Sequence, residues 1–254
     1  MKNSLEKNHQ NDTGAKRLDV YLVEKEIVPS RQKAQKIIDN ELVLVDGEIA
    51  QKYNKKIKPE HIVEVKDFDL YVGRGDEKLE YAIKKFSINT SQKVCMDVGS
   101  STGGFTEVLI QSGALKVYAF DTGSDQFDQG LLQENKDKII LSESTDIRDI
   151  DVLPDKIDFC VIDVSFISLK SVLPDVFRLM REGGEIAALI KLQFEVGSAK
   201  IKKGIVTDPI DAKNAVSDIE NFVINSGCKI IRTIEAKPKG KKGNQEYFIH
   251  IQCT

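Results

Sequence analysis

The stretch Val94-Cys95-Met96-Asp97-Val98-Gly99-Ser100-Ser101-Thr102-Gly103-Gly104-Phe105 joins an apolar run that ends in an acid to a glycine-rich turn. An amphipathic pattern continues to about Gln111, so the stretch predicts a strand, a loop and a helix. Because glycine has no side chain, Gly99, Gly103 and Gly104 allow a tight turn that approaches a ligand closely. The next apolar run ends in Asp121, where a carboxylate can accept hydrogen bonds from a ribose diol. The two runs together predict a pocket for a nucleoside cofactor.

The glycine spacing separates two classes of cofactor. A dinucleotide fingerprint has the spacing G-x-G-x-x-G, with the pyrophosphate at the helix N-terminus. Here the spacing is D-x-G-x-x-x-G-G, and Asp97 would repel a pyrophosphate but suits a cofactor with a cationic end. S-adenosylmethionine carries an ammonium and a sulfonium, so the spacing favours it over a nicotinamide dinucleotide. An ordinary βα turn without a ligand remains the alternative.

The composition is that of an ordinary globular protein, with 254 residues, 30% of them charged, and a net charge of -3. This mild net charge means that any RNA contact must come from local patches. The cysteines form no C-x-x-C pair and the three histidines are isolated, so we expect reduced thiols and no metal site. No apolar stretch is long enough to span a bilayer, and the polar N-terminus has no signal-peptide core. We therefore expect a cytoplasmic protein with no membrane partner.

The N-terminal part of the chain predicts a tail and a small domain. Residues 1–15 are polar and predict disorder. Residues 16–66 predict a compact α+β domain, in which two short helices precede a hairpin that turns at Asp46-Gly47. Four pieces of this domain resemble the S4-like RNA-binding domain: Arg17-Leu18-Asp19, Ser30-Arg31, Lys33-Ala34 and Val43-x-Val45-Asp46-Gly47.

The S4 resemblance implies which residues of this domain bind RNA. It assigns phosphate contacts to Arg17, Arg31 and Lys33, with Ser30 in the same block, because anchoring that ignores base identity is mostly cation to phosphate. A solvated helix face is the alternative explanation for the same side chains.

A linker over 67–76 leads into a second domain over 77–254, in which apolar runs alternate with helical patterns. Strands separated by helices predict a mainly parallel, doubly wound sheet of the Rossmann-like α/β class. The last two strands, expected over 229–235 and 247–252, have no helix between them and predict one antiparallel edge. This is the layout of a seven-stranded methyltransferase.

Ionisable side chains end two of the predicted strands. Asp163 stands near the end of one apolar run and Lys191 ends the next. Ligands of open α/β sheets gather at the carboxyl ends of strands, so both side chains are expected to face the same crevice as Asp97 and Asp121. An ion pair that only closes the sheet is the alternative.

A basic loop precedes the final strand. Lys239, Lys241 and Lys242 are interleaved with glycine and proline, and Glu246 opens the strand that follows. A flexible basic loop beside a crevice suits a phosphate clamp, although a solvated charge run is the plainer interpretation.

Five blocks in order resemble the hemolysin-A (TlyA) family, in which an S4-like domain precedes an FtsJ-like methyltransferase domain. The blocks are Arg74-Gly75 with Lys78-Leu79-Glu80, Asp97-Val98-Gly99-x-Ser101-Thr102-Gly103-Gly104-Phe105, Asp163-Val164-Ser165-Phe166-Ile167-Ser168-Leu169, Leu189-Ile190-Lys191 with Gln193-Phe194-Glu195, and Gly243-Asn244-x-Glu246. The resemblance implies a Lys-Asp-Lys-Glu catalytic tetrad at Lys78, Asp163, Lys191 and Glu246.

The tetrad suits the chemistry that the resemblance implies, which is 2'-O-methylation of ribose, of cytidine, in ribosomal RNA. A ribose 2'-hydroxyl is a poor nucleophile, so a base must take its proton during the attack on the methyl group. The resemblance gives this role to Lys191, with Lys78 and Glu246 orienting the hydroxyl and Asp163 holding the lysine. The implied partners are ribosomal RNA or ribosomal subunits, and a 2'-hydroxyl target excludes DNA.

The resemblance also implies the residues that bind S-adenosylmethionine and RNA. It places the cofactor against Asp97, Gly99, Ser101, Gly103, Gly104, Phe105, Asp121, Asp146 and Ile147. It adds Arg74, Lys239, Lys241 and Lys242 to the RNA contacts.

Five positions depart from the family pattern: Gly73, Asp76, Asp125, Phe127 and Leu192. Serine is usual at 73, glycine at 76 and 125, leucine at 127 and proline at 192. They leave the tetrad intact, so activity is expected. Two other interpretations remain open, a non-catalytic RNA-binding or ribosome-assembly factor and a hemolysin-like activity.

Overall fold

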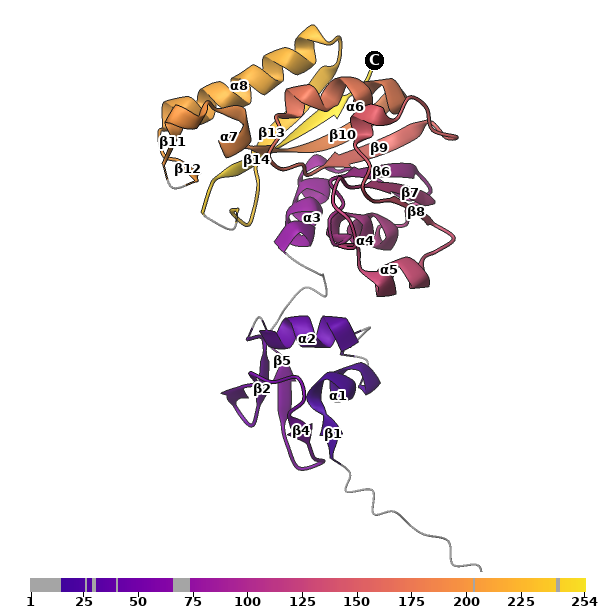
Figure 1. The fold of residues 1–254 in the computed structure, drawn as a ribbon, viewed down its shortest axis with the longest axis vertical. Helices are drawn as coiled ribbons and strands as arrows, with labels where there is room; N and C mark the ends of the chain where they lie inside the picture. The colour runs from indigo at the N-terminus through magenta and orange to yellow at the C-terminus, as the bar shows by residue number, and fades with distance from the viewer. Residues whose placement is uncertain are drawn as a thin grey trace, which may run out of the picture. The chain divides into compact units, whose positions relative to one another are not determined.

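The computed structural model describes residues 15–25, 27–28, 31–39, 41–65, 74–202, 204–240 and 243–254. The chain divides into two compact units, Met1–Leu70 and Tyr71–Thr254. Figure 1 shows both units.

The first unit packs two helices against short antiparallel strands. Its elements are β1 (Lys16–Arg17), α1 (Leu18–Glu24), α2 (Arg31–Asp39), β2 (Val43–Val45), β3 (Glu48–Ile49), β4 (Lys56–Ile57) and β5 (Val63–Val65). Strands β3, β2 and β5 form one sheet, and β1 pairs with β4. The predicted turn joins β2 to β3, with Asp46 and Gly47 both at positive φ, as a two-residue hairpin turn requires. The predicted helices and hairpin are confirmed.

The second unit is built on a seven-stranded sheet. Its helices of four or more residues are α3 (Arg74–Phe86), α4 (Gly104–Gln111), α5 (Gln129–Glu134), α6 (Leu173–Leu179), α7 (Leu192–Glu195) and α8 (Pro209–Asn225). Its sheet strands are β6 (Val94–Val98), β7 (Lys116–Phe120), β8 (Ile139–Ser142), β9 (Ile157–Ile162), β10 (Met180–Lys191), β13 (Lys229–Glu235) and β14 (Glu246–Gln252). A separate two-stranded ribbon pairs β11 (Ile201–Lys202) with β12 (Ile205–Val206).

The strand order is β13-β14-β10-β9-β6-β7-β8. Five neighbouring strands, from β10 to β8, pair in parallel, as the alternating pattern predicts. The sequence also predicts one antiparallel edge, but β14 lies inside the sheet, antiparallel to both β10 and β13. The chain passes β10, forms β13 at the edge and then returns through the loop after β13 to fill the gap. Glu246 therefore starts an interior strand.

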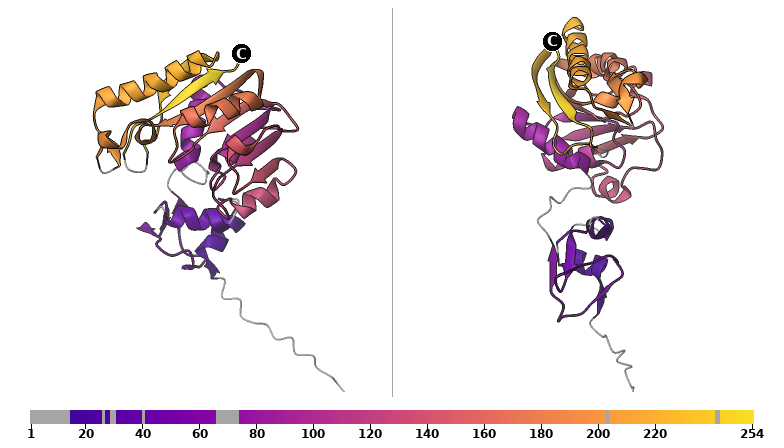
Figure 2. Two further views of the ribbon diagram at one scale, coloured as in Figure 1. Left: turned by 45° about the horizontal axis from the view of Figure 1, so that its top comes forward. Right: turned by 90° about the vertical axis from the view of Figure 1, so that its left-hand side faces the viewer.

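Helices cover both faces of the sheet, as Figures 1 and 2 show. Leu79 of α3 and Leu109 of α4 share one buried cluster with Phe159 and Leu189 of the sheet. On the opposite face, α6 and α8 pack against side chains that alternate with these along the strands. Because side chains of a strand alternate between faces, Val161 of β9 and Ala187 of β10 also point toward α3 and α4.

Candidate active site

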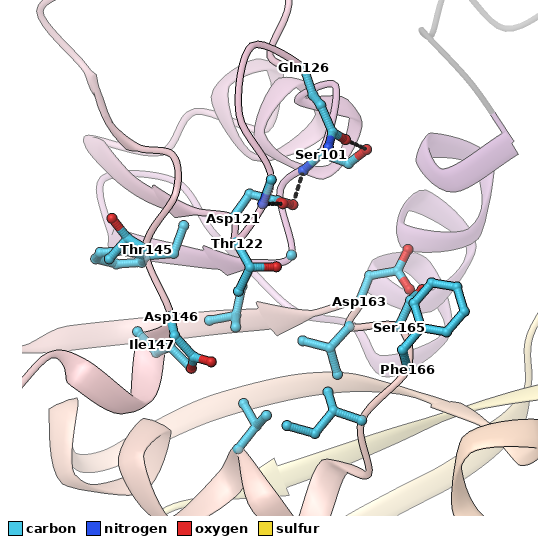
Figure 3. A pocket seen from close by; sticks show the side chains of 17 residues that line it. Ser101, Asp121, Thr122, Gln126, Thr145, Asp146, Ile147, Asp163, Ser165 and Phe166 are labelled. Atoms are coloured by element: carbon cyan, nitrogen blue, oxygen red, sulfur yellow. Dashed lines mark hydrogen bonds between the residues drawn. The ribbon is translucent and has the colours of Figure 1, made fainter.

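A cavity of about 400 Å³ opens at the carboxyl ends of the central strands. Figure 3 shows Asp146 and Ile147 toward one side and Asp163, Ser165 and Phe166 toward the other. Six of the residues predicted from the sequence line it: Gly99, Ser101, Asp121, Asp146, Ile147 and Asp163. The strand order places this cavity where open α/β sheets bind their ligands.

Asp121 joins two loops at the cavity wall. Its carboxylate accepts a hydrogen bond from the backbone amide of Ser101 at 2.7 Å and another from that of Gly123 at 2.7 Å. A carboxylate has about four lone-pair sites, so two remain for ligand hydroxyls. The predicted ribose acid is therefore fixed in place before any ligand binds.

Asp97 lies beneath α4 and does not line the cavity. Its carboxylate is fully buried and accepts a hydrogen bond from the Thr106 hydroxyl at 2.7 Å, while Oδ1 has no hydrogen-bond partner among the described residues. Burial raises the pKa of Asp97 to about 7, and the Thr106 hydrogen bond opposes this shift only in part. Gly103, Gly104 and Phe105 also lie outside the cavity lining.

Two glycines of the turn lie close to other parts of the protein. A Cβ on Gly99 would lie 2.6 Å from the carbonyl oxygen of Asp163, so glycine lets the end of β6 approach the segment after β9. A Cβ on Gly103 would lie 2.8 Å from the Phe127 ring. The sequence predicts a close approach to a ligand, and the structure shows that the same glycines also bring the loops together.

Lys191 has two partners from the segment that follows β9. Its Nζ lies 2.5 Å from Asp163 Oδ1 in an ion pair, and it donates a hydrogen bond to the Ser165 hydroxyl at 2.9 Å. The Lys191 side chain is 13% exposed. The short distance of the ion pair and the low exposure of Lys191 strengthen the attraction between the two charges, because little water competes for the amine.

Lys78 and Glu246 form a second, more deeply buried pair. Lys78 Nζ donates to Glu246 Oε2 at 2.6 Å, with the two side chains 10% and 5% exposed. The backbone of the loop before β14 covers the acid, because a Cβ on Gly240 would lie 2.5 Å from Glu246 Oε1. Asn244 ties this loop to the β11–β12 ribbon, where its side chain donates to the Gly204 carbonyl oxygen at 2.8 Å.

The sheet register brings the two pairs to one place. Lys191 of β10 stands directly opposite Glu246 of β14, and cross-strand partners project from the same face. By strand alternation Lys191, Glu246 and Asp163 all point toward the face covered by α3, which carries Lys78. All four residues of the predicted tetrad therefore meet at the carboxyl ends of β9 and β10.

Three residues near the cavity carry interactions that the sequence pattern did not single out. Ser165 contacts Lys191, and Phe166 is 92% exposed at the cavity with φ of 65°. Glu143 accepts hydrogen bonds from the backbone amides of residues 125–127, which hold its pKa below the usual range. Ser165 and Phe166 lie in a block quoted for the resemblance, but their contacts depend on the folded loop.

The departures at 125 and 192 have structural explanations. Asp125 has φ of 55°, a left-handed conformation that glycine adopts freely and aspartate tolerates. Leu192 begins α7 and is 1% exposed, so it closes the turn after Lys191 by packing in the core. The side chain of Asp76 is not described.

In the first unit, a buried acid holds two of the predicted RNA-binding arginines. Arg17 donates to Asp19 through Nε and a terminal nitrogen, both at 3.0 Å, and Arg31 donates to the same carboxylate at 2.9 and 3.3 Å. Gln35 donates to it at 3.1 Å, and the Arg17 guanidinium lies 5.8 Å from the centre of the Tyr53 ring. Both arginines keep an exposed part, whereas the acid has none.

The remaining predicted RNA contacts are only partly described. Lys239 is exposed, next to the glycine that covers Glu246. Ser30, Lys241 and Lys242, the side chains of Lys33 and Arg74, and residues 1–14 lie outside the described part of the structure.

The described part of the chain has neither a cluster of metal ligands nor a membrane-spanning helix. Among the described residues, no group of three or more His, Cys, Asp or Glu side chains is placed to hold a metal ion. Within the same ranges, no helix has the length and apolar content needed to cross a membrane.

Comparisons with known proteins identify the family of the chain. The FtsJ-like methyltransferase family model matches residues 71–253, and the S4 domain model matches residues 16–63. Hemolysin A from Brachyspira hyodysenteriae is 36% identical over 92% of this chain and 99% of its own length. The 16S/23S rRNA (cytidine-2'-O)-methyltransferase TlyA from Mycobacterium tuberculosis is 33% identical over 93% of this chain and 89% of its own length.

A solved structure of a candidate hemolysin from Streptococcus thermophilus matches with a TM-score of 0.73 and 31% identity, covering 95% of this chain and 90% of that chain. The predicted fold, enzyme class and cofactor, S-adenosylmethionine, are confirmed by these matches. The chain belongs to the FtsJ-like methyltransferase family and carries an S4 domain ahead of its methyltransferase unit.

Proposed function

We propose that the protein transfers a methyl group to a ribose 2'-hydroxyl, that of a cytidine, in ribosomal RNA. The observation that carries the proposal is the meeting of two lysine–acid pairs on one sheet face beside the cavity. Relatives that match most of this chain are named as rRNA cytidine-2'-O-methyltransferases, which supports the substrate class. The proposal also assigns the protein to the cytoplasm, the compartment of its ribosomal substrate.

The cavity residues fit the donor, S-adenosylmethionine. When bound, it supplies an electrophilic methyl group carried on a sulfonium. Asp121, already held by two backbone amides, accepts from the ribose hydroxyls, and Asp146 and Ile147 border the adenine. A cation bound above Asp97, whose buried Oδ1 has no partner among the described residues, would shift this carboxyl from its protonated toward its charged form.

Lys191 is the proposed base. In its uncharged form the amine would accept the proton of the 2'-hydroxyl while the ribose oxygen forms a bond to the donor methyl carbon and the sulfur leaves as a neutral thioether. Asp163, 2.5 Å from Nζ, then stabilises the ammonium that forms. Because both groups are held by the sheet, the reaction requires little reorganisation of the protein.

The second pair orients the ribose. Glu246 stands opposite Lys191 in the register, and Lys78 holds it at 2.6 Å. The Glu246 side chain is 5% exposed and the Gly240 backbone covers Oε1, so the pair orients the ribose through the position that it gives to Lys191 across the strands. The pair therefore acts on the geometry of the attack rather than on proton transfer itself.

RNA contacts come from both units. Arg17 and Arg31 of the first unit, and Lys239 of the second, present cations to phosphates. Phe166 exposes an aromatic face at the cavity, which suits stacking of a base that leaves its helix. Arg74, Lys33, Ser30, Lys241 and Lys242 remain predicted contacts.

The decisive experiment is a methyl-transfer assay with labelled S-adenosylmethionine and ribosomal subunits, followed by nucleoside digestion to identify 2'-O-methylcytidine. We expect Lys191→Ala to lower kcat roughly 100- to 10,000-fold, the usual range for loss of a general base. Lys136→Ala, which removes an exposed lysine before β8, serves as the matched control and should retain activity. Calorimetry should show that both variants still bind the cofactor.

Two outcomes contradict the proposal in different ways. Unchanged transfer in both Lys191→Ala and Asp163→Ala would show that the tetrad assignment is wrong. A wild-type protein that binds ribosomal RNA but transfers no methyl group would favour a non-catalytic RNA-binding factor instead.

A further inference from the structure

We infer that Ser165 is a positioning residue for Lys191, and that it fixes the direction from which the ribose hydroxyl must approach the amine. This inference rests on the proposed function. It starts from the two contacts of Lys191 Nζ, one with Asp163 Oδ1 at 2.5 Å and one with the Ser165 hydroxyl at 2.9 Å.

The hydrogens on the uncharged amine determine how these two contacts orient its lone pair. An uncharged lysine amine has two N–H bonds and one lone pair in a tetrahedral arrangement. Ser165 accepts one of these N–H bonds, which stops rotation about the Cε–Nζ bond. Asp163 Oδ1 lies 2.5 Å from Nζ without accepting a hydrogen bond from it, and its negative charge repels the lone pair, so the lone pair takes the position that faces away from Asp163. With Asp163 alone, the amine rotates about its Cε–Nζ bond and the lone pair has no fixed direction, because lysine is a point charge on a flexible stem.

The low exposure of Lys191 makes the second contact matter. Its side chain is 13% exposed, and a water that replaces the exposed Ser165 hydroxyl would lack the fixed position that the backbone gives the serine. Ser165 and Asp163 line the cavity and Lys191 does not, so the amine meets the donor site at these two contacts. Geometry of this kind contributes to the rate without adding binding energy.

The backbone around Ser165 is held from both sides. The segment after β9 packs against Gly99, where a Cβ would lie 2.6 Å from the Asp163 carbonyl oxygen. On the other side, Phe166 has φ of 65°, a conformation that is a genuine outlier for a bulky residue and that the surroundings must impose. Phe166 also contacts the Phe194 ring, with ring centres 5.2 Å apart.

A third contact ties the same segment to α7, which begins directly after Lys191. Glu195 accepts hydrogen bonds from the Ser168 hydroxyl at 2.5 Å and from the Leu169 amide at 2.9 Å. The segment that carries Ser165 and the segment that carries Lys191 are therefore linked independently of the contact between them. Loss of the Ser165 hydroxyl leaves both segments in place and removes only the hydrogen bond to the amine.

The test compares Ser165→Ala, Ser165→Thr and Ser168→Ala in the full chain, with wild type assayed in parallel. Ser165 is exposed, so its hydroxyl is not needed for folding. Ser168→Ala removes a hydroxyl hydrogen bond from the same segment but none from Lys191. The readouts are kcat and KM for ribosomal subunits, the Kd for S-adenosylmethionine from calorimetry, and the melting temperature.

We expect Ser165→Ala to lower kcat about 10- to 100-fold, as misorientation of a reacting group does, while KM and the cofactor Kd change less than about 3-fold. Ser165→Thr keeps a hydroxyl and should restore most of the rate, and Ser168→Ala should stay within about 3-fold of wild type. An active wild type with a fully active Ser165→Ala overturns the role of Ser165 alone. Equal losses of kcat and melting temperature in Ser165→Ala and Ser168→Ala also overturn it, since they show a structural role. A wild type without transfer activity overturns the proposed function and this inference together.

Discussion

Among the described residues, a fully buried aspartate in each unit shows an opposite shift of its carboxyl pKa. Asp19 of the S4 unit and Asp97 of the methyltransferase unit are both 0% exposed. Asp19 accepts hydrogen bonds from two guanidiniums and an amide side chain, which hold its pKa well below the usual range against the effect of burial. Asp97 has one hydroxyl partner, and burial raises its pKa to about 7.

The difference shows that partners, rather than burial, decide whether a carboxyl stays charged. Removing a carboxylate from water favours the neutral acid unless nearby donors or cations compensate. At Asp19 the compensating cations lie partly at the surface, with Arg17 and Arg31 side chains 37% and 54% exposed. At Asp97 the compensation is incomplete, and the missing positive charge is what a cationic ligand would supply.

The largest expected effect concerns Asp97. Its pKa of about 7 lies above the ordinary value of 3.8, so the folded unit favours the protonated acid. The stabilisation is complete below about pH 4 and is lost as the pH rises through 7. A shift of about three pKa units corresponds to about 4 kcal/mol in the free energy of unfolding. Asp97→Asn should remove this pH dependence, which urea unfolding followed by methyl NMR signals of this unit will measure.

Asp151→Asn is the control for Asp97, because the Asp151 side chain is 99% exposed. It should leave the pH dependence as in wild type. If Asp97→Asn and wild type lose stability in parallel between pH 4 and 8, Asp97 is charged in the folded protein and the two sites do not differ.

A smaller effect of opposite sign is expected at Asp19. Its pKa is lowered in the folded state, so its contribution is present above about pH 4 and is lost as the pH falls below that value. Asp19→Asn leaves two guanidiniums on a neutral side chain and should cost about 2 to 3 kcal/mol at pH 7, less than for a fully buried pair because the arginines reach solvent. Methyl NMR signals of the S4 unit during urea unfolding will report the loss.

The wild-type advantage over Asp19→Asn should shrink in acid, as wild-type Asp19 takes up its proton. Glu60→Gln, which changes an exposed acid of the same unit, should have little effect at any pH. An advantage that stays constant down to pH 2 would mean that the contacts of Asp19 are structural and independent of its charge.

The tetrad is predictable from the sequence because each member lies in a separate, recognisable block. Asp163 and Lys191 end apolar runs, and this pattern alone predicts that they lie at the carboxyl ends of strands. The sequence does not show that Glu246 faces Lys191, since that depends on β14 inserting between β10 and β13. The position of β14 depends on how the whole sheet pairs. The apolar pattern of β14 itself would be the same inside the sheet or at its edge.

Other features escape prediction because they depend on which side chains meet. Asp97 is predicted at the cofactor, but strand alternation turns it under α4 toward Thr106, and its predicted role in binding stays a prediction. The sequence shows Ser165 only as one residue of a family block, because its contact with Lys191 forms only in the folded loop. The β11–β12 ribbon has two residues per strand, too few to show an alternating pattern.

The smallest expected effect tests whether the arginines held by Asp19 face RNA. Each guanidinium has five N–H donors and spends two on Asp19, so three remain for phosphate oxygens. Arg31→Ala should weaken binding to ribosomal RNA about 5- to 10-fold and lower the slope of log affinity against log salt by about 0.7 to 0.9, the value for one phosphate contact. Lys58→Ala, which removes a cation paired with Glu60, is the control. Equal slopes in Arg31→Ala and wild type, measured by fluorescence anisotropy over a salt series, would mean that Asp19 holds Arg31 for stability alone, and the contrast with Asp97 would then concern folding rather than substrate binding.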